Sequence, residues 1–143
     1  MTPPSPDDTR QILEGLSAVT RQLARASGAA DGGPPMTSTQ RLALFEAAIG
    51  GPLRLSELAE RMGITAPTAS RAVDGLVDLG LVERLPDPAD RRAVRIDLTS
   101  SGRTDVEGRK ARAAAALQPA AGALSAQDRA QLAVLLRRLA DAL

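Results

Sequence analysis

A short polar segment, residues 65–71, places hydrogen-bonding side chains in the first turns of a predicted helix. Thr68, Ser70 and Arg71 fall outside the apolar stripe of that helix and can face outward. An arginine can hold a guanine through two hydrogen bonds, and Pro67 and Thr68 can add apolar contact to a thymine methyl group. The alternative is that these are ordinary solvated positions of a short helix. Their place in the first turns favours contact with base edges or phosphates.

A second basic site, Arg91 and Arg92, lies in the segment PDPADRR at residues 86–92, between two predicted strands. Asp90 can close a turn on the backbone there. Adjacent residues of a tight turn point apart, so only one of the two arginines is expected to enter a minor groove. The other arginine would meet a phosphate or an acidic side chain of the same chain. The simpler alternative is that both arginines only keep a hairpin soluble.

Overall charge gives no sign of a nucleic-acid partner. The chain has 143 residues, enough for one domain, and a net charge of +1. Residues 54–95 contain seven arginines and seven acidic residues. Binding to DNA would therefore depend on a few well-placed arginines, doubled in any dimer, and not on a broad basic surface.

Composition also narrows the chemistry. The chain has no cysteine and no histidine, which excludes thiol redox sensing, the usual zinc sites and a Ser-His-Asp triad. The only lysine, Lys110, has no apparent serine partner, and no glycine-rich phosphate loop follows a strand. We expect no metal, no cofactor and no enzymatic activity. No segment is long and apolar enough to cross a membrane and no signal peptide is present, so a cytoplasmic protein is expected.

Two short helices followed by a hairpin are predicted for residues 53–99. Ser56 is the candidate cap of the first helix, and Gly63 should end it in a left-handed conformation. Thr65 is the candidate cap of the second helix, which should stop at Gly80. Residues 81–85 and 93–98 have the composition and alternation of strands. This order of elements is a helix-turn-helix with a wing.

Longer helices are predicted on both sides of this core. Residues 1–7 should form a loose tail, and Asp8 with Gln11 should cap a helix over residues 8–26. A second capping box, Thr37 with Gln40, should begin the helix whose inner face we assign to Leu42, Phe45 and Ile49. Phe45, the only aromatic residue, is interpreted as core packing under the helix-turn-helix, in preference to a ligand-stacking role.

The C-terminal part of the chain should form two helices. Thr99 is expected to cap a long helix with Val106 on its inner side, and Pro119 and Gly122 are expected to break it. Ser125 with Asp128 should then begin a last helix.

Several of these stretches together resemble the MarR (multiple antibiotic resistance regulator) family of winged-helix transcription factors. The matching segments are SELAERMGI, TAPTASR, GLVER and DPADRR followed by VRIDLTSSGR. The resemblance implies a mainly α fold with a small β-hairpin wing (α+β) and N- and C-terminal dimerisation helices. It implies one domain over residues 8–143, with the winged core at about 37–99 and dimerisation helices at about 8–26 and 100–143.

The resemblance also assigns roles in the wing and shows one departure. Arg92 would be the minor-groove residue, and Asp90 would hold the shape of the wing. Gly75 stands where the family often has a larger, basic residue, and Asp74 and Asp78 would repel phosphates if they faced them. The expected DNA-binding residues are Thr65, Pro67, Thr68, Ser70, Arg71, Asp90, Arg91 and Arg92.

The terminal helices carry apolar stripes that a small winged core cannot cover completely. One interpretation is an intramolecular three-helix pack. The other, which the resemblance favours, is a two-fold homodimer that sets two recognition helices about 34 Å apart, one turn of DNA. The expected dimerisation residues are Ile12, Leu16, Leu23, Leu132, Leu136 and Leu139.

These observations predict a homodimeric regulator that binds double-stranded DNA at a pseudo-palindromic site, more as a repressor than as an activator. The resemblance further implies a small-molecule effector held between the terminal helices and the winged core. The main alternative is a winged-helix protein-interaction module without DNA binding, because of the balanced charge of residues 54–95. An enzyme is a distant third, since no nucleophile and base can be assembled.

Overall fold

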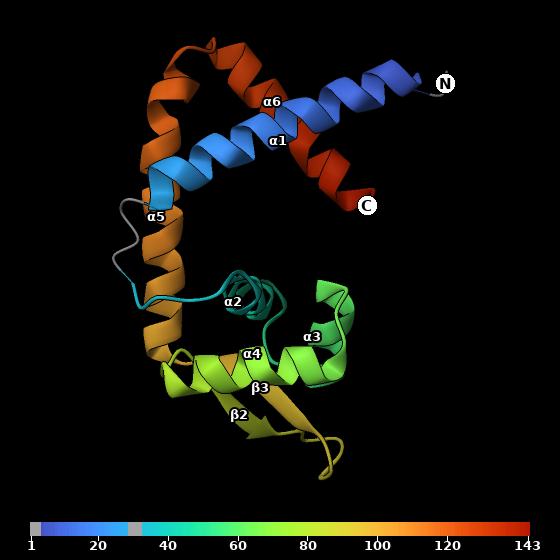
Figure 1. Ribbon diagram of the computed structural model, residues 1–143, viewed down its shortest axis with the longest axis vertical. Coiled ribbons are helices and arrows are strands. Elements are labelled where there is room, and N and C mark those ends of the chain that lie inside the picture. Colours follow the sequence, from blue (N-terminus) through green and yellow to red (C-terminus); the bar gives the residue numbers. More distant parts are fainter. Residues whose placement is uncertain (1–3, 29–32) are drawn as a thin grey trace. The chain divides into compact units, whose positions relative to one another are not determined.

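The computed structural model describes residues 4–28 and 33–143. Six helices and three short strands occur in these residues (Figure 1). In chain order they are α1 (Pro6–Gly28), α2 (Ser38–Gly50), β1 (Leu53–Arg54), α3 (Leu55–Met62), α4 (Ala66–Asp78), β2 (Val82–Pro86), β3 (Val94–Leu98), α5 (Ser100–Gly122) and α6 (Ala126–Asp141). The predicted fold class, mainly helical with a small hairpin wing, is confirmed. None of the described helices is long and apolar enough to span a membrane.

The chain divides into two compact units. The winged unit comprises residues 31–110, and the terminal-helix unit comprises residues 1–30 and 111–143. The boundary falls inside α5, so the first half of this helix packs with the winged unit. The winged unit is therefore wider than the predicted core of residues 37–99.

The winged unit contains a three-stranded antiparallel sheet in the order β1-β3-β2. β2 and β3 form the predicted hairpin, with Val82 opposite Leu98 and Pro86 opposite Val94. β1 pairs Arg54 with Arg95 on the other side of β3. It was not predicted, because two residues are too few to show an alternating pattern. In Figure 1 the hairpin lies beside α4, on the side away from α2.

The core of the winged unit lies between α2, α3, α4, the sheet and the start of α5. Its largest fully buried side chains are Leu44, Leu58, Val73, Leu76, Ile96 and Val106. Leu58 of α3 and Ala69 and Val73 of α4 are buried, so both helices turn an apolar face to the core.

The predicted inner face of α2 is wrong. Leu42 and Ile49 are exposed and Phe45 is half-buried, whereas Leu44 is completely buried and the alanines beside it, Ala43 and Ala47, are nearly so. α2 has apolar residues on most of its surface, so periodicity could not choose between two faces. The face with two alanines lets α2 approach its neighbours closely, with Leu44 at its centre. Phe45 packs against the core from its edge, so its interpretation as core packing is confirmed.

Most helix caps in the winged unit agree with the sequence prediction. The hydroxyl of Thr37 accepts from the Gln40 backbone N–H at 3.2 Å, and the Gln40 side chain accepts from Thr37 N at 2.8 Å. Gly63 ends α3 with φ 64° and ψ 31°, in the left-handed region. Ser56 is not the cap of α3: Arg54 holds that place, and its backbone N–H donates to the Glu57 carboxylate at 2.7 Å.

The terminal helices differ from prediction at their ends. α1 begins at Pro6 and is capped by Ser5 with Asp8, so the box assigned to Asp8 and Gln11 is wrong, and residues 6 and 7, assigned to the tail, belong to the helix. Residues 1–3 lie outside the described residues. α5 continues through Pro119 and ends at Gly122, so of the two predicted breaks only the one at Gly122 is found. Ser125 caps α6 as predicted, with its hydroxyl 3.1 Å from Asp128 N.

Thr99 joins the hairpin to α5. Its hydroxyl donates to the Gly80 carbonyl at 2.6 Å and accepts from the Gly102 N–H at 3.0 Å, as predicted for the cap of α5. Its backbone N–H donates to the Leu81 carbonyl at 3.1 Å. A Cβ atom at Gly102 would overlap that carbonyl, so only glycine permits this close approach. The junction fixes the start of α5 against the hairpin.

Candidate nucleic-acid interface

Helix α4 presents a polar outer face at its start. The Thr65 hydroxyl caps the helix by accepting from Thr68 N at 3.4 Å, and Pro67 lies in the first turn. Ala69 and Val73 point into the core, which leaves Thr68 on the outside. The predicted recognition residues therefore share one accessible end of the helix, although Ser70 is half-buried.

Arg71 extends this surface along α4. Its side chain is exposed and forms no ion pair with any residue in 4–28 or 33–143. Its guanidinium donors are available to an external acceptor. A planar guanidinium in this state suits both guanine edges and phosphates.

Gly75 lies against α2, not on an outward-facing surface. A Cβ atom at this position would overlap the side-chain amide of Gln40, whose oxygen completes the cap of α2. A larger residue would therefore displace a capping group. Packing against Gln40 therefore explains why residue 75 is glycine. The sequence interpretation, which considered only a lost phosphate contact, did not include this packing.

Asp74 does not stand as an uncompensated negative charge on α4. Its Oδ1 atom is 2.6 Å from Nη2 of Arg84 on β2, in a partly exposed ion pair. The pair links the recognition helix to the hairpin. Because Arg84 is paired in this way, it is not counted among the wing arginines that are available to DNA.

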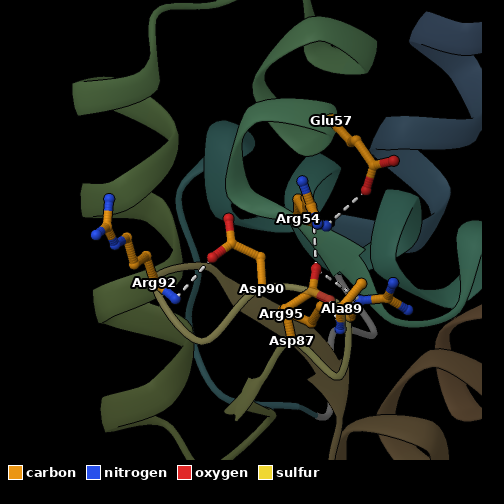
Figure 2. A network of polar contacts seen from close by, with 7 residues as sticks. All are labelled: Arg54, Glu57, Asp87, Ala89, Asp90, Arg92 and Arg95. Carbon is orange, nitrogen blue, oxygen red and sulfur yellow. Dashed lines mark hydrogen bonds and ion pairs between the residues drawn. The ribbon is translucent and has the colours of Figure 1, made fainter.

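Asp87 lies at the base of the wing turn with a fully buried side chain. Its Oδ2 atom accepts from Arg54 Nε at 2.6 Å and lies 3.2 Å from Arg95 Nε, and its Oδ1 atom accepts from Ala89 N at 2.8 Å (Figure 2). The hydrogen bonds from Arg54 and Ala89, with smaller contributions from the contact with Arg95 and the charge of Arg54, hold the pKa of the Asp87 carboxyl well below its usual range, although burial opposes them. In the other direction, the hydrogen bond to Asp87 and the charge of its carboxylate raise the pKa of Arg54.

Asp90 shapes the tip of the turn, as its sequence position suggested. Its Oδ1 atom accepts from Arg92 N at 2.9 Å (Figure 2). Its carbonyl accepts from Ala93 N at 2.9 Å. Arg91 and Arg92 are exposed, and neither pairs with an acidic side chain of the described chain. The intramolecular partner considered for Arg91 is thus not found in these residues.

Sequence reasoning missed the three residues that hold the wing, namely Arg54, Asp87 and Arg95. Arg54 and Asp87 are 33 positions apart, and no local pattern links them. The only available signal was a carboxylate between two prolines, Pro86 and Pro88, at the end of a predicted strand.

The remaining predicted site residues lie on the terminal helices. Ile12, Leu16, Leu132 and Leu136 are exposed, and Leu23 and Leu139 are half-buried. No residue of α6 is buried. Within the described chain no group of three or more acidic residues is placed to hold a metal ion.

A helix-turn-helix of α3 and α4, followed by a hairpin that carries exposed arginines, defines the winged helix-turn-helix class of proteins. The profile of the MarR family matches residues 35–93. Among curated proteins, the chain is 32% identical to the HTH-type transcriptional repressor NicR of Pseudomonas putida, over 76% of this chain and 68% of that protein. It is 31% identical to the HTH-type transcriptional regulator ML2140 of Mycobacterium leprae, over 67% of each.

Solved structures agree with this class. RV1404 of Mycobacterium tuberculosis superposes with a TM-score of 0.81 at 25% identity, over 98% of this chain and 95% of that one. Wild-type MarR of E. coli in its apo form gives a TM-score of 0.70 at 26% identity, over 97% and 98% of the two chains. The chain belongs to the MarR family and is a transcriptional regulator with a helix-turn-helix. These relatives are regulators and not enzymes.

Proposed function

We propose that this regulator binds double-stranded operator DNA as a homodimer and represses transcription by occluding a promoter. One observation carries the proposal. Arg71 on the outer face of α4 and Arg91 and Arg92 at the wing tip are exposed, and no acidic residue of the described chain pairs with them. In winged helix-turn-helix proteins these two places face the major groove and the adjacent minor groove or backbone.

The balanced charge of residues 54–95 does not oppose this proposal. Asp87 and Asp74 are paired with arginines inside the winged unit, and those pairs account for Arg54, Arg95 and Arg84. These pairs leave four arginines and five acidic residues in residues 54–95, so binding to DNA depends on where the remaining arginines lie and not on net charge. The electrostatic attraction to DNA would come from the arginines that remain without such a partner.

The exposed apolar stripes of the terminal helices support a homodimer. Ile12 of α1 is 50% exposed and Leu136 of α6 is 43% exposed. An intramolecular three-helix pack would bury these side chains, which makes it the weaker explanation. A second copy of the chain could cover both stripes through the same patches on each protomer, as a two-fold dimer requires.

Repression, effector response and a cytoplasmic location complete the proposal. Repression is supported by the similarity to NicR, which is described as a transcriptional repressor. A small-molecule effector is proposed from the family resemblance. The expected DNA contacts are those assigned from the sequence, in the first turns of α4 and in the wing.

Selection from a random duplex pool by the purified protein tests this function. We expect enrichment of a motif with two half-sites in two-fold symmetry, spaced by about one helical turn. The control is a variant with Arg71, Arg91 and Arg92 all changed to alanine, which should remain folded and enrich nothing. Recovery of random sequences by both proteins would contradict operator recognition.

A protein-interaction module without DNA binding is the second candidate. Seven arginines against seven acidic residues in residues 54–95 favour it. It predicts that the protein binds no duplex even at low ionic strength, where non-specific DNA binding is strongest. Binding of any duplex that weakens as salt is added would exclude this alternative.

A further inference from the structure

The buried carboxylate of Asp87 joins three elements of the winged unit. Arg54 comes from β1 and caps α3, Arg95 comes from β3, and Ala89 belongs to the wing turn. Asp87 itself follows directly after β2, and its backbone N–H donates to the Ala93 carbonyl at 3.1 Å. The helix-turn-helix and the wing turn thus share one charged group (Figure 2).

The register of the sheet explains why a carboxylate is needed there. Arg54 and Arg95 are directly opposite each other in the β1–β3 pair. Like charges in this arrangement repel and destabilise the strand pair. Asp87 lies within ion-pair distance of both, at 2.6 Å and 3.2 Å, and offsets the repulsion. A buried carboxylate is in turn stable only while such partners remain.

The residues proposed to touch DNA lie just beyond this group. The last ladder pair of the hairpin is Pro86 with Val94, so residues 87–93 form the turn. Asp90 orders the tip of the turn internally, through Arg92 N and Ala93 N. Asp87 connects the base of the same turn to α3 through Arg54. The direction in which Arg91 and Arg92 project therefore depends on both carboxylates. Two ion pairs in the described residues join the hairpin to the helix-turn-helix, Asp74–Arg84 at strand β2 and Arg54–Asp87 at the base of the turn, and only the second includes a residue of the turn itself.

We propose that Asp87 is a positioning residue for DNA binding, whose pairs with Arg54 and Arg95 set the orientation of the wing turn relative to the recognition helix. Asp87 makes no contact with DNA itself. Its removal releases the turn, so that Arg91 and Arg92 no longer meet the duplex while α4 remains in place. The inference rests on the proposed DNA-binding function and adds how the two contact regions are held together.

A double-mutant cycle with Asp87→Asn tests this role on a duplex selected by the unaltered protein. Asparagine keeps an acceptor for Ala89 N but loses the charge between the two arginines. Asp87→Asn should weaken binding by about tenfold, as expected when a pair of wing contacts is lost. In the Arg91→Ala/Arg92→Ala background it should change the affinity less than twofold, and in the Arg71→Ala background it should keep its full effect.

Footprinting distinguishes a displaced wing from a general loss of stability, because a general loss would weaken major-groove and wing protection together. With Asp87→Asn, protection of guanine N7 in the major groove should persist at saturating protein, and hydroxyl-radical protection of the flanking backbone by the wing should disappear. Asp97→Asn is the matched control. Asp97 lies in the same hairpin, and its Oδ2 atom is 3.3 Å from Nη2 of Arg103, whose side chain is exposed. This variant should retain both protections.

Arg95→Gln provides a second test if Asp87→Asn does not fold. This variant loses the Arg95–Asp87 pair but keeps the hydrogen bond from Arg54 to Asp87, so it should be less destabilised. It should weaken wing protection in the same pattern but less completely. The proposal is overturned if Asp87→Asn, or Arg95→Gln in its place, leaves wing protection intact or reduces affinity equally with and without Arg91 and Arg92. If the unaltered protein selects no duplex, it is the DNA-binding function that fails.

Discussion

Asp87 is a single residue on which the pH dependence of stability should depend. Its pKa in the folded state is lowered, first by the hydrogen bond from Arg54, so its pairs stabilise the fold fully above the unfolded pKa of about 3.9. That stability is lost as the pH falls from this value toward the lower folded pKa. The melting temperature of the unaltered protein should exceed that of Asp87→Asn most clearly at neutral pH. The difference should shrink below about pH 4, and a difference that stays constant down to pH 3 would contradict the assignment.

Arg71 is the residue for which base reading can be separated from phosphate contact. If its guanidinium holds a base edge, Arg71→Ala should cost about 1–3 kcal/mol on the selected duplex and relax the preference at one position. Binding to random duplex should change much less. Equal losses on both duplexes would show that Arg71 touches only phosphate.

Gly33 tests a packed position just before α2. A Cβ atom there would overlap the Asp105 carboxylate and lie 2.6 Å from Nη2 of Arg109, two groups that form a buried ion pair at 2.6 Å. Arg109 also donates to the Pro34 carbonyl at 3.2 Å. Gly33→Ala should destabilise the protein by about 1–3 kcal/mol through overpacking.

Gly15 supplies the control for that substitution. It lies inside α1 with nothing near the position of a Cβ atom, so Gly15→Ala should be neutral or stabilise the helix by about 0.5–1 kcal/mol. Chemical denaturation of both variants measures the contrast. A stable Gly33→Ala protein would mean that the Asp105–Arg109 pair moves aside without loss.

At the scale of elements, the wing should contribute a backbone contact that can be counted by salt dependence. Arg92→Ala should weaken binding on all duplexes and reduce the slope of log K against log salt by about one unit for each protomer bound. If Arg92 enters a minor groove, the loss should grow with the AT content beside the half-site. Arg103→Ala, which removes an arginine paired with Asp97 near the hairpin base, serves as the control and should leave the slope unchanged.

The elements with strong local signals were predicted well from the sequence. The caps at Thr37, Thr65 and Ser125 and the left-handed Gly63 each depend on residues within one turn, and all four are confirmed. The hairpin was predicted to within one residue at each strand.

What the sequence did not predict depends on contacts between distant segments. The buried face of α2 was assigned wrongly because Leu44 and its neighbouring alanines are selected by close packing, not by periodicity. The Arg54–Asp87 pair and strand β1 join residues more than thirty positions apart. For the candidate site, the position of the recognition residues was predictable, but the group that holds the wing was not.

At the scale of the whole molecule, folding and association should be coupled. Leu136→Asp would place a carboxylate in the apolar stripe proposed for the dimer, at a cost of several kcal/mol against a total stability of about 5–15 kcal/mol. We expect a destabilised chain that no longer binds the selected duplex. The melting temperature of the unaltered protein should rise with concentration, because association supplies stability.

Ala130→Asp is the control for the dimer. Ala130 is exposed on α6 and lies on the side opposite Leu139, so the added charge should leave association intact. Sedimentation distinguishes the outcomes. A folded monomer at micromolar concentration, with a melting temperature that does not change on dilution, would favour the intramolecular helix pack.

The most direct test of the account is a salt titration of the unaltered protein on its selected duplex and on a random duplex of the same length. We predict that log K falls linearly with log salt on both, with a slope of several units, and that the selected duplex is preferred throughout. This result would mean that a chain of nearly neutral charge binds DNA through a few placed arginines. Absence of binding to either duplex at low salt would contradict the account.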